Sequence, residues 1–206
     1  MITTADAAAF SLTIASGGVA VFPADTVYGL AAAPDDLAAV ARLYELKGRQ
    51  PTKPAALMFF DRDRALAALP ELGPRTRGAA ERLLPGGVTL LLPQPETGEG
   101  GTGADPADAP ALGLRVPLLD GPLAALAGVE LAVVQSSANL AGGPDPRTLA
   151  DVPQAIRDGV DLVLDAGPLP GTSSTVIDLR GYERAGTWTI VRAGAVSAQR
   201  VAQTLG

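Results

Sequence analysis

The sequence predicts an α/β fold built on a mixed β-sheet. Strand-like apolar runs and helix-like segments alternate over the whole length, which favours the α/β class. Two strand-like runs follow each other directly near the C-terminus, which indicates a mixed rather than a purely parallel sheet. Only 8 of the 206 residues are aromatic and 38 are Ala, which argues against an aromatic-rich β-sandwich. No linker stands out, so we predict one domain over residues 1–206.

Local signals place the elements of the first half. An Ala-rich run that ends at Gly17 predicts the first helix, and Pro23 stops the short apolar strand after it. Asp35 can cap the next helix, whose Leu37 and Tyr44 fall on one face. The elements expected here are a helix at 5–16, a strand at 19–22, a helix from 35 to 48, a strand at 55–60, a helix at 75–84 and a strand at 88–92.

The second half continues the alternation after one unusual segment. Residues 93–110 are rich in Gly, Pro, Thr, Glu and Asp and hold no branched aliphatic or aromatic residue. The segment is longer than an ordinary connection, so we expect a mobile loop. Beyond it we expect strands at 112–116 and 131–134, helices at 120–127 and 148–157, strands at 160–165, 174–179 and 187–192, and a helix at 197–205.

Composition excludes several kinds of chemistry. The chain has no Cys and no His, so it can form neither a disulfide framework, nor a Ser-His-Asp triad, nor the usual zinc sites. Its net charge of −6 argues against a duplex-binding domain, which needs a positive surface. We find no signal peptide and no apolar run long enough to span a membrane, so we expect a cytoplasmic protein.

The choice of basic residues points to one segment. Fourteen of the 16 basic residues are Arg, and the two Lys, Lys47 and Lys53, flank Arg49. Three cations in an irregular stretch suit a polyphosphate, although a cation beside a helix end also complements the helix dipole. Lys retained in an Arg-biased chain suggests a site that requires compact ammonium groups.

Polar residues gather where the expected strands end. Asp25 and Thr26 follow the strand at 19–22, where ligands are commonly bound in α/β sheets, although the same residues also favour a simple turn. Arg115 lies on an otherwise apolar strand and needs an anionic partner, which is either an internal carboxylate or a bound ligand. Ser- and Thr-rich junctions at 135–139 and 171–175 suit a pocket for a polar ligand.

Seven motifs in order resemble the YrdC-like threonylcarbamoyl-AMP synthases, in their single-domain form. They are PADTVYGL (23–30), LYELKGRQPTKP (43–54), LPGGVTLLLP (84–93), LGLRVP (112–117), SSANLAG (136–142), GTSSTVIDL (171–179) and IVRAGA (190–195). The resemblance implies a twisted mixed sheet with flanking helices around a deep ligand cavity. It also implies synthesis of L-threonylcarbamoyladenylate and pyrophosphate from ATP, L-threonine and bicarbonate, with Mg²⁺ carried on the ATP phosphates and no metal site in the protein.

The resemblance also assigns roles to residues of this sequence. Lys47 and Arg49 would be catalytic. The implied ATP-binding residues are Arg49, Lys53, Ser137, Asn139, Asp145 and Arg192. The implied threonine-binding residues are Thr26, Met58, Arg115, Gln135 and Ser174. Many family members have a polar residue, often His, near Met58, so this chain departs from the family pattern there.

The resemblance places the product in tRNA modification. The adenylate would feed the N6-threonylcarbamoyladenosine of tRNA through downstream tRNA threonylcarbamoyl transferase proteins. The acidic chain is not expected to bind tRNA tightly alone. Two alternatives stay open: a non-catalytic RNA-binding module of the same fold, and a sibling carbamoyl-adenylate enzyme with another acceptor.

Overall fold

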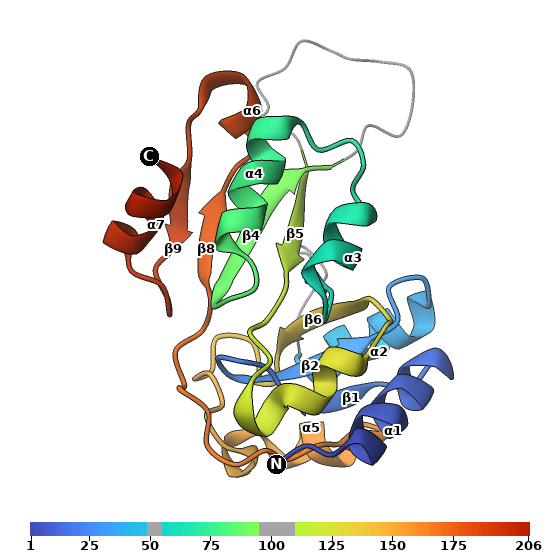
Figure 1. Ribbon diagram of the computed structural model, residues 1–206. Helices are drawn as coiled ribbons and strands as arrows, with labels where there is room; N and C mark the ends of the chain where they lie inside the picture. Colours follow the sequence, from blue (N-terminus) through green and yellow to red (C-terminus); the bar gives the residue numbers. More distant parts are fainter. Residues whose placement is uncertain (49–54, 95–109) are drawn as a thin grey trace.

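The computed structural model describes residues 1–48, 55–94 and 110–206 (Figure 1). Arg49 and Lys53, and nearly all of the segment 93–110, lie outside the described residues. Within the described ranges, no helix is long and apolar enough to cross a membrane.

One mixed sheet connects the whole described chain, as the sequence predicts. Its strand order is β7-β1-β2-β6-β3-β5-β4-β8-β9. The pairs β1–β7, β3–β5 and β4–β8 are parallel, and the other neighbours are antiparallel. The strands are β1 (Ala20–Pro23), β2 (Tyr28–Ala32), β3 (Ala56–Met58), β4 (Val88–Pro93), β5 (Ala111–Arg115), β6 (Val133–Ser137), β7 (Leu162–Val163), β8 (Thr175–Asp178) and β9 (Thr189–Arg192).

Helices flank both parts of this sheet. Figure 1 shows α1, α2 and α5 gathered around β1, β2 and β6, with α4 and α7 beside β4, β8 and β9. The helices are α1 (Thr4–Ala15), α2 (Leu37–Leu46), α3 (Arg62–Ala67), α4 (Pro74–Leu83), the 3₁₀ helix η1 (Gly121–Gly128), the 3₁₀ turn η2 (Leu149–Asp151), α5 (Gln154–Asp158), α6 (Tyr182–Ala185) and α7 (Ala198–Leu205). The α/β class with a mixed sheet is therefore confirmed. The single domain stays a prediction.

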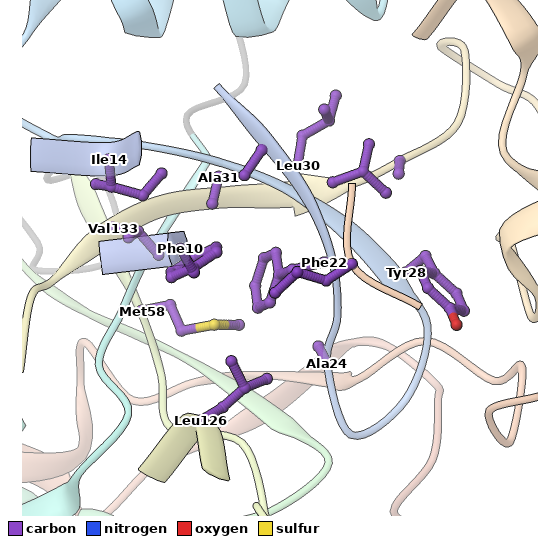
Figure 2. Packing of buried hydrophobic residues seen from close by; sticks show 14 of the residues in the cluster. Phe10, Ile14, Phe22, Ala24, Tyr28, Leu30, Ala31, Met58, Leu126 and Val133 are labelled. Carbon is purple, nitrogen blue, oxygen red and sulfur yellow. The ribbon is translucent and has the colours of Figure 1, made fainter. Parts of the chain in front are cut away.

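Two apolar clusters hold the helices to the sheet. The first packs α1 on β1 and β2 around Phe10, Phe22 and Phe60, whose ring centroids lie 5.1–6.1 Å apart. Figure 2 shows Phe10 and Phe22 within this cluster. The second packs α4 and α7 on β4, β5 and β8, around side chains such as Leu90 and Ile177. The cavity described below lies along the strands that connect these two clusters.

The predicted elements differ from the observed ones mainly where residues are small or proline intervenes. No local signal predicts β2, because Gly29, Ala31 and Ala32 are weak strand formers. The strand forms because β1 and β6 flank it and its side chains are fully buried. The expected helix at 148–157 is interrupted at Pro153, and the helix expected at 120–127 is a 3₁₀ helix.

The helix expected from 35 to 48 forms as α2, but its cap and buried face differ from the prediction. Asp36 rather than Asp35 caps it, with its carboxylate accepting hydrogen bonds from the two main-chain amides 38 and 39 at 3.0 Å. Leu37 is 80% exposed, and the buried face consists of Ala39, Leu43 and Tyr44.

Candidate functional site

A polar cavity of about 380 Å³ lies among β5, β6, β8, β9 and the turn between β1 and β2. Six of the site residues expected from the sequence line it together, although they come from five separate segments. They are Thr26, Arg115, Gln135, Ser137, Ser174 and Arg192. Thr89, Ser136 and Ser173 also line the cavity. Ser136 and Ser173 belong to the two junctions that the sequence indicated as a pocket, whereas Thr89 was not predicted. Thr89 could have been noticed as a hydroxyl within an otherwise apolar strand.

Arg115 is the most buried cation of this wall, with only 3% of its surface exposed. It ends β5, and its Nη2 donates hydrogen bonds to the carboxylate of Asp25 and, at 2.6 Å, to Oγ1 of Thr26. Asp25 in turn accepts a hydrogen bond from the amide of Leu118 at 3.1 Å. The internal partner that the sequence left open is therefore Asp25.

Arg115 still has a donor to offer. Its Nε is buried and has no hydrogen-bond partner within the described ranges. Burial lowers the pKa of Arg115, the negative charge of Asp25 opposes this shift, and the nearby charge of Arg192 adds to it. A buried guanidinium with an unused N–H beside a polar cavity is suited to bind a carboxylate or a phosphate.

Ser174 lies between two other polar residues of the cavity. Its hydroxyl oxygen is 2.7 Å from that of Thr89 on β4. Arg192 donates from Nη2 to the carbonyl and to the hydroxyl oxygen of Ser174, at 2.9 and 3.2 Å. The β8–β9 register shifts by one residue, so that Arg192 pairs with Val176. Such a bulge redirects side chains, and here Arg192 and Val176 both line the cavity.

Gln135 occupies the next position along the wall. It lies on β6 opposite Ala31, and its side chain packs against Gly29 of β2. Within the described ranges its amide makes no hydrogen bond to the protein, so its donors and acceptor are available to a bound molecule.

Lys47 is not among the residues that line the cavity. It is 2% exposed, and its Nζ donates to the carbonyls of Ser137 and Asn139 and to Oδ1 of Asn139. The bond to the Asn139 carbonyl is 2.9 Å long. Lys47 follows α2 directly, and Ser137 ends β6, so the hydrogen bonds of Lys47 connect the end of the helix to this turn.

Asn139 and Asp145 likewise lie outside the residues that line the cavity. Asn139 accepts a hydrogen bond from the hydroxyl of Ser137 at 2.5 Å and donates to the carbonyl of Gly143 at 2.6 Å. Its side chain therefore organises the turn that carries Ser137. Asp145 is half-buried further along the same loop.

Met58 is the clearest difference from the expected site. Its side chain is fully buried in the first apolar cluster and lies near Phe22 and Leu126 (Figure 2). It is absent from the residues that line the cavity. Met58 follows Ala56 by two residues and pairs with Arg115 of β5, so it shares the sheet face that carries the cavity, but its side chain is buried in the first apolar cluster. The contact between Met58 and threonine stays a prediction.

The described residues offer no cluster of three or more metal-ligating side chains. The cavity wall instead combines guanidinium, hydroxyl and amide groups, without His or Cys. Such groups bind and orient anions and neutralise developing charge, and they need not form a covalent bond to the substrate.

Comparison with known proteins shows the family of this chain. A family model named for Sua5, YciO and YrdC, and described as "Telomere recombination", matches residues 13–194. The threonylcarbamoyl-AMP synthase of Chromohalobacter salexigens is 36% identical over 174 residues, which cover 81% of this chain and 89% of the relative.

Two further relatives come from Pyrococcus abyssi. Its threonylcarbamoyl-AMP synthase is 28% identical over 200 residues, which cover 94% of this chain. The match covers only 55% of that relative, so the chain spans about half of its length. The structure of P. abyssi Sua5 complexed with L-threonine superposes with a TM-score of 0.81 at 25% identity, over 100% of this chain and 59% of the other. Because the family model covers most of the sequence, this chain belongs to the Sua5/YciO/YrdC family.

Proposed function

We propose that this protein is an L-threonylcarbamoyladenylate synthase. It joins ATP, L-threonine and bicarbonate, and it releases threonylcarbamoyl-AMP and pyrophosphate. This assignment makes it a nucleotidyltransferase. Its relatives carry the name threonylcarbamoyl-AMP synthase, which supports the proposal.

The buried, partly unpartnered guanidinium of Arg115 is the observation that carries the proposal. The residue lines the cavity wall, where its positive charge is suited to bind the α-carboxylate of an amino acid. Thr26, Gln135 and Ser174 surround it with hydroxyl and amide groups that can bond the threonine hydroxyl. The P. abyssi relative was solved with L-threonine, which fits this amino-acid subsite.

The nucleotide takes the other polar groups. Ser137 and Arg192 are on the cavity wall and are available to the ribose or the phosphates. From the family resemblance we assign Arg49 and Lys53 to the triphosphate. Mg²⁺ enters on the phosphates, because it prefers oxygen ligands and retains water, and it neutralises their charge. Lys47 contributes by hydrogen bonding to the turn that carries Ser137 and Asn139. Asp145 follows that turn in the chain, and from the family resemblance we assign Asn139 and Asp145 to the nucleotide.

The proposed chemistry matches these residue types. Bicarbonate gives up hydroxide and becomes CO₂. The neutral amine of threonine bonds to the carbon of CO₂ and loses a proton to that hydroxide, which gives a carbamate and water. A carbamate oxygen then attacks the α-phosphorus of ATP, and pyrophosphate leaves with the electron pair of the broken P–O bond. This transfer depends on positioning and charge neutralisation rather than on a nucleophilic side chain.

The product is then handed to other proteins. We propose that tRNA threonylcarbamoyl transferase proteins in the cytoplasm receive the adenylate. The net charge of −6 leaves little basic surface for tracking phosphates, so binding of tRNA by this protein alone is weak at physiological salt.

Pyrophosphate release with each substrate omitted in turn tests the assignment. The expected result is release only when ATP, Mg²⁺, bicarbonate and L-threonine are all present. Equal release without threonine would instead indicate a sibling enzyme with another acceptor. No release, together with tight tRNA binding, would indicate a non-catalytic RNA-binding module.

A further inference from the structure

Thr175 is a buried polar residue that lines neither the polar cavity nor its neighbour. A second hollow of about 500 Å³ lies beside the first and is mostly apolar; Gly87, Ala195 and Val196 line part of it. Thr175 is the first residue of β8, and its side chain is fully buried next to these residues. It follows Ser173 and Ser174 directly, which both line the polar cavity.

The Thr175 hydroxyl bonds both main-chain polar groups of one residue. It donates to the carbonyl of Val196 at 2.6 Å and accepts from the amide of Val196 at 3.0 Å. The amide of Thr175 donates to the carbonyl of Gly87 at 3.0 Å. One residue therefore connects β8 to the start of β4 and to the segment 194–196.

The segment 194–196 packs directly on the serines of the cavity wall. The amide of Ala195 donates to the carbonyl of Ser173 at 2.9 Å. A methyl group added at Gly194 would stand 2.6 Å from the carbonyl oxygen of Ser174 and would also contact that of Ser173. Because these are main-chain atoms, they cannot move aside as a flexible side chain can.

Two residues, Ser174 and Arg192, connect the segment 194–196 to the cavity. Ser174 presents its hydroxyl to the cavity, and Arg192, two residues before the segment, donates to that same serine. A shift of the segment 194–196 would move the serine main chain and the guanidinium together.

We propose that Thr175 is a positioning residue for the amino-acid subsite. Its hydroxyl holds the segment 194–196 against Ser173 and Ser174, and it thereby fixes the Ser174 hydroxyl beside bound threonine and the bond that Arg192 donates to Ser174. The proposal rests on the proposed function, and it adds a residue that acts without touching the substrate.

Thr175→Val and Thr175→Ser test the hydroxyl directly. Valine has the same shape but leaves both polar groups of Val196 without their partner, whereas serine keeps the bonds. We expect Thr175→Val to raise KM for threonine about tenfold with kcat within about twofold, and Thr175→Ser to stay within about twofold of the parent in both. A parent-like KM in Thr175→Val would overturn the proposal.

A matched control separates positioning from general destabilisation. Thr76 is equally buried, lies on α4 away from the cavity, and bonds Glu183. Thr76→Val should lower the melting temperature without changing KM. If Thr76→Val raised KM as much as Thr175→Val does, the effect would be general and the proposal wrong.

Gly194→Ala supplies an independent perturbation of the same segment. It should raise KM for threonine as Thr175→Val does, because the added methyl displaces the serine main chain. Gly128→Ala, at a position with no atom within 4 Å, is the control and should match the parent. A Gly194→Ala enzyme with parent kinetics would contradict the proposed packing.

Hydrogen exchange separates this proposal from the proposed function. In Thr175→Val, exchange at the Val196 amide should accelerate about tenfold or more, while that of Thr175→Ser should match the parent. This readout requires no turnover. If the parent released pyrophosphate equally without threonine, the proposed function would be wrong, but the exchange rate of the Val196 amide would still test the role of Thr175. An unchanged exchange rate in Thr175→Val would overturn the positioning role.

Discussion

Arg115 and Lys47 are two buried cations with different surroundings. Arg115 is paired with a carboxylate and keeps a donor beside the cavity. Lys47 directs its ammonium to main-chain and amide oxygens of one turn. The planar guanidinium can bond Asp25 and Thr26 along one side and still face a ligand, whereas the compact ammonium directs its donors to closely spaced acceptors. Arg115 is therefore suited to binding substrate, whereas Lys47 is suited to stabilising the turn beside the cavity.

Removing Arg115 should have the largest effect. Arg115→Met leaves the carboxylate of Asp25 buried without its cation, which should cost about 3–5 kcal/mol of the free energy of unfolding. It should also reduce threonine-dependent turnover by roughly 30-fold or more, because a charged contact to the substrate is lost. Urea unfolding and pyrophosphate release measure the two effects.

The double variant Asp25→Asn with Arg115→Met is the control. It removes both charges, so it should regain much of the stability but none of the activity. Equal stability of the single and double variants would show that Asp25 is not the partner that matters.

Replacing Lys47 by Arg should have the next largest effect. The larger, planar group cannot make the same bonds to the turn at Ser137 and Asn139, so we expect a loss of about 1–3 kcal/mol in the free energy of unfolding. Turnover should fall too, since Ser137 lines the cavity. Arg62→Lys, at a half-exposed surface pair, is the control and should change stability by less than about 0.5 kcal/mol. Parent-like stability and turnover in Lys47→Arg would contradict this assignment.

Gly29→Ala should change the cavity with little effect on the fold. The added methyl would stand 2.6 Å from Nε2 of Gln135, the far end of a flexible side chain, which can rotate away. We expect KM for threonine to rise about three- to tenfold while the urea midpoint changes little. The rise should largely vanish in a Gln135→Ala background, where the amide closest to the methyl is gone and the remaining neighbours, Phe22 and the Ser136 carbonyl, stand 3.3 Å away. A rise that persists there would show that Gln135 is not responsible.

The smallest effect concerns pH and the hairpin that carries Asp25. Burial, and then the bond to Asp165, raises the pKa of Tyr28 above the unfolded value of 10.0. The folded state therefore favours the neutral phenol, and this contribution to stability is complete below pH 10 and is lost as pH rises toward the folded pKa. Urea midpoints above pH 10 should fall more steeply for the parent than for Tyr28→Phe. If the urea midpoints of the parent and of Tyr28→Phe fell in parallel above pH 10, the pKa of Tyr28 would not be raised in the folded state.

Much of the fold follows from local sequence signals. Strands such as β4 and β8 are short apolar runs bounded by Gly, Pro or Ser, and helices such as α4 and α7 show clear start and stop residues. These local signals do not reveal β2, because its small residues have no strand preference and only its two neighbours in the sheet make it a strand. Pairing across the sheet is a long-range property, and no local window contains it.

The candidate site divides in the same way. Residue type alone marked Arg115 as a cation that needs an anionic partner, and the absence of His and Cys excluded whole classes of mechanism. The family motifs indicated which side chains to consider. They did not reveal that Thr89 lies beside Ser174, because those residues are 85 positions apart.

The sequence by itself therefore determined the fold class, the order of most elements and the kinds of side chain available for chemistry. Only the tertiary structure decided which of those side chains share the cavity. Met58 and Lys47 show the reason, because the place of each side chain depends on what packs against it. Met58 packs in the apolar cluster that holds the aromatic rings. Lys47 donates hydrogen bonds to the carbonyl oxygens of a turn some ninety residues later in the chain.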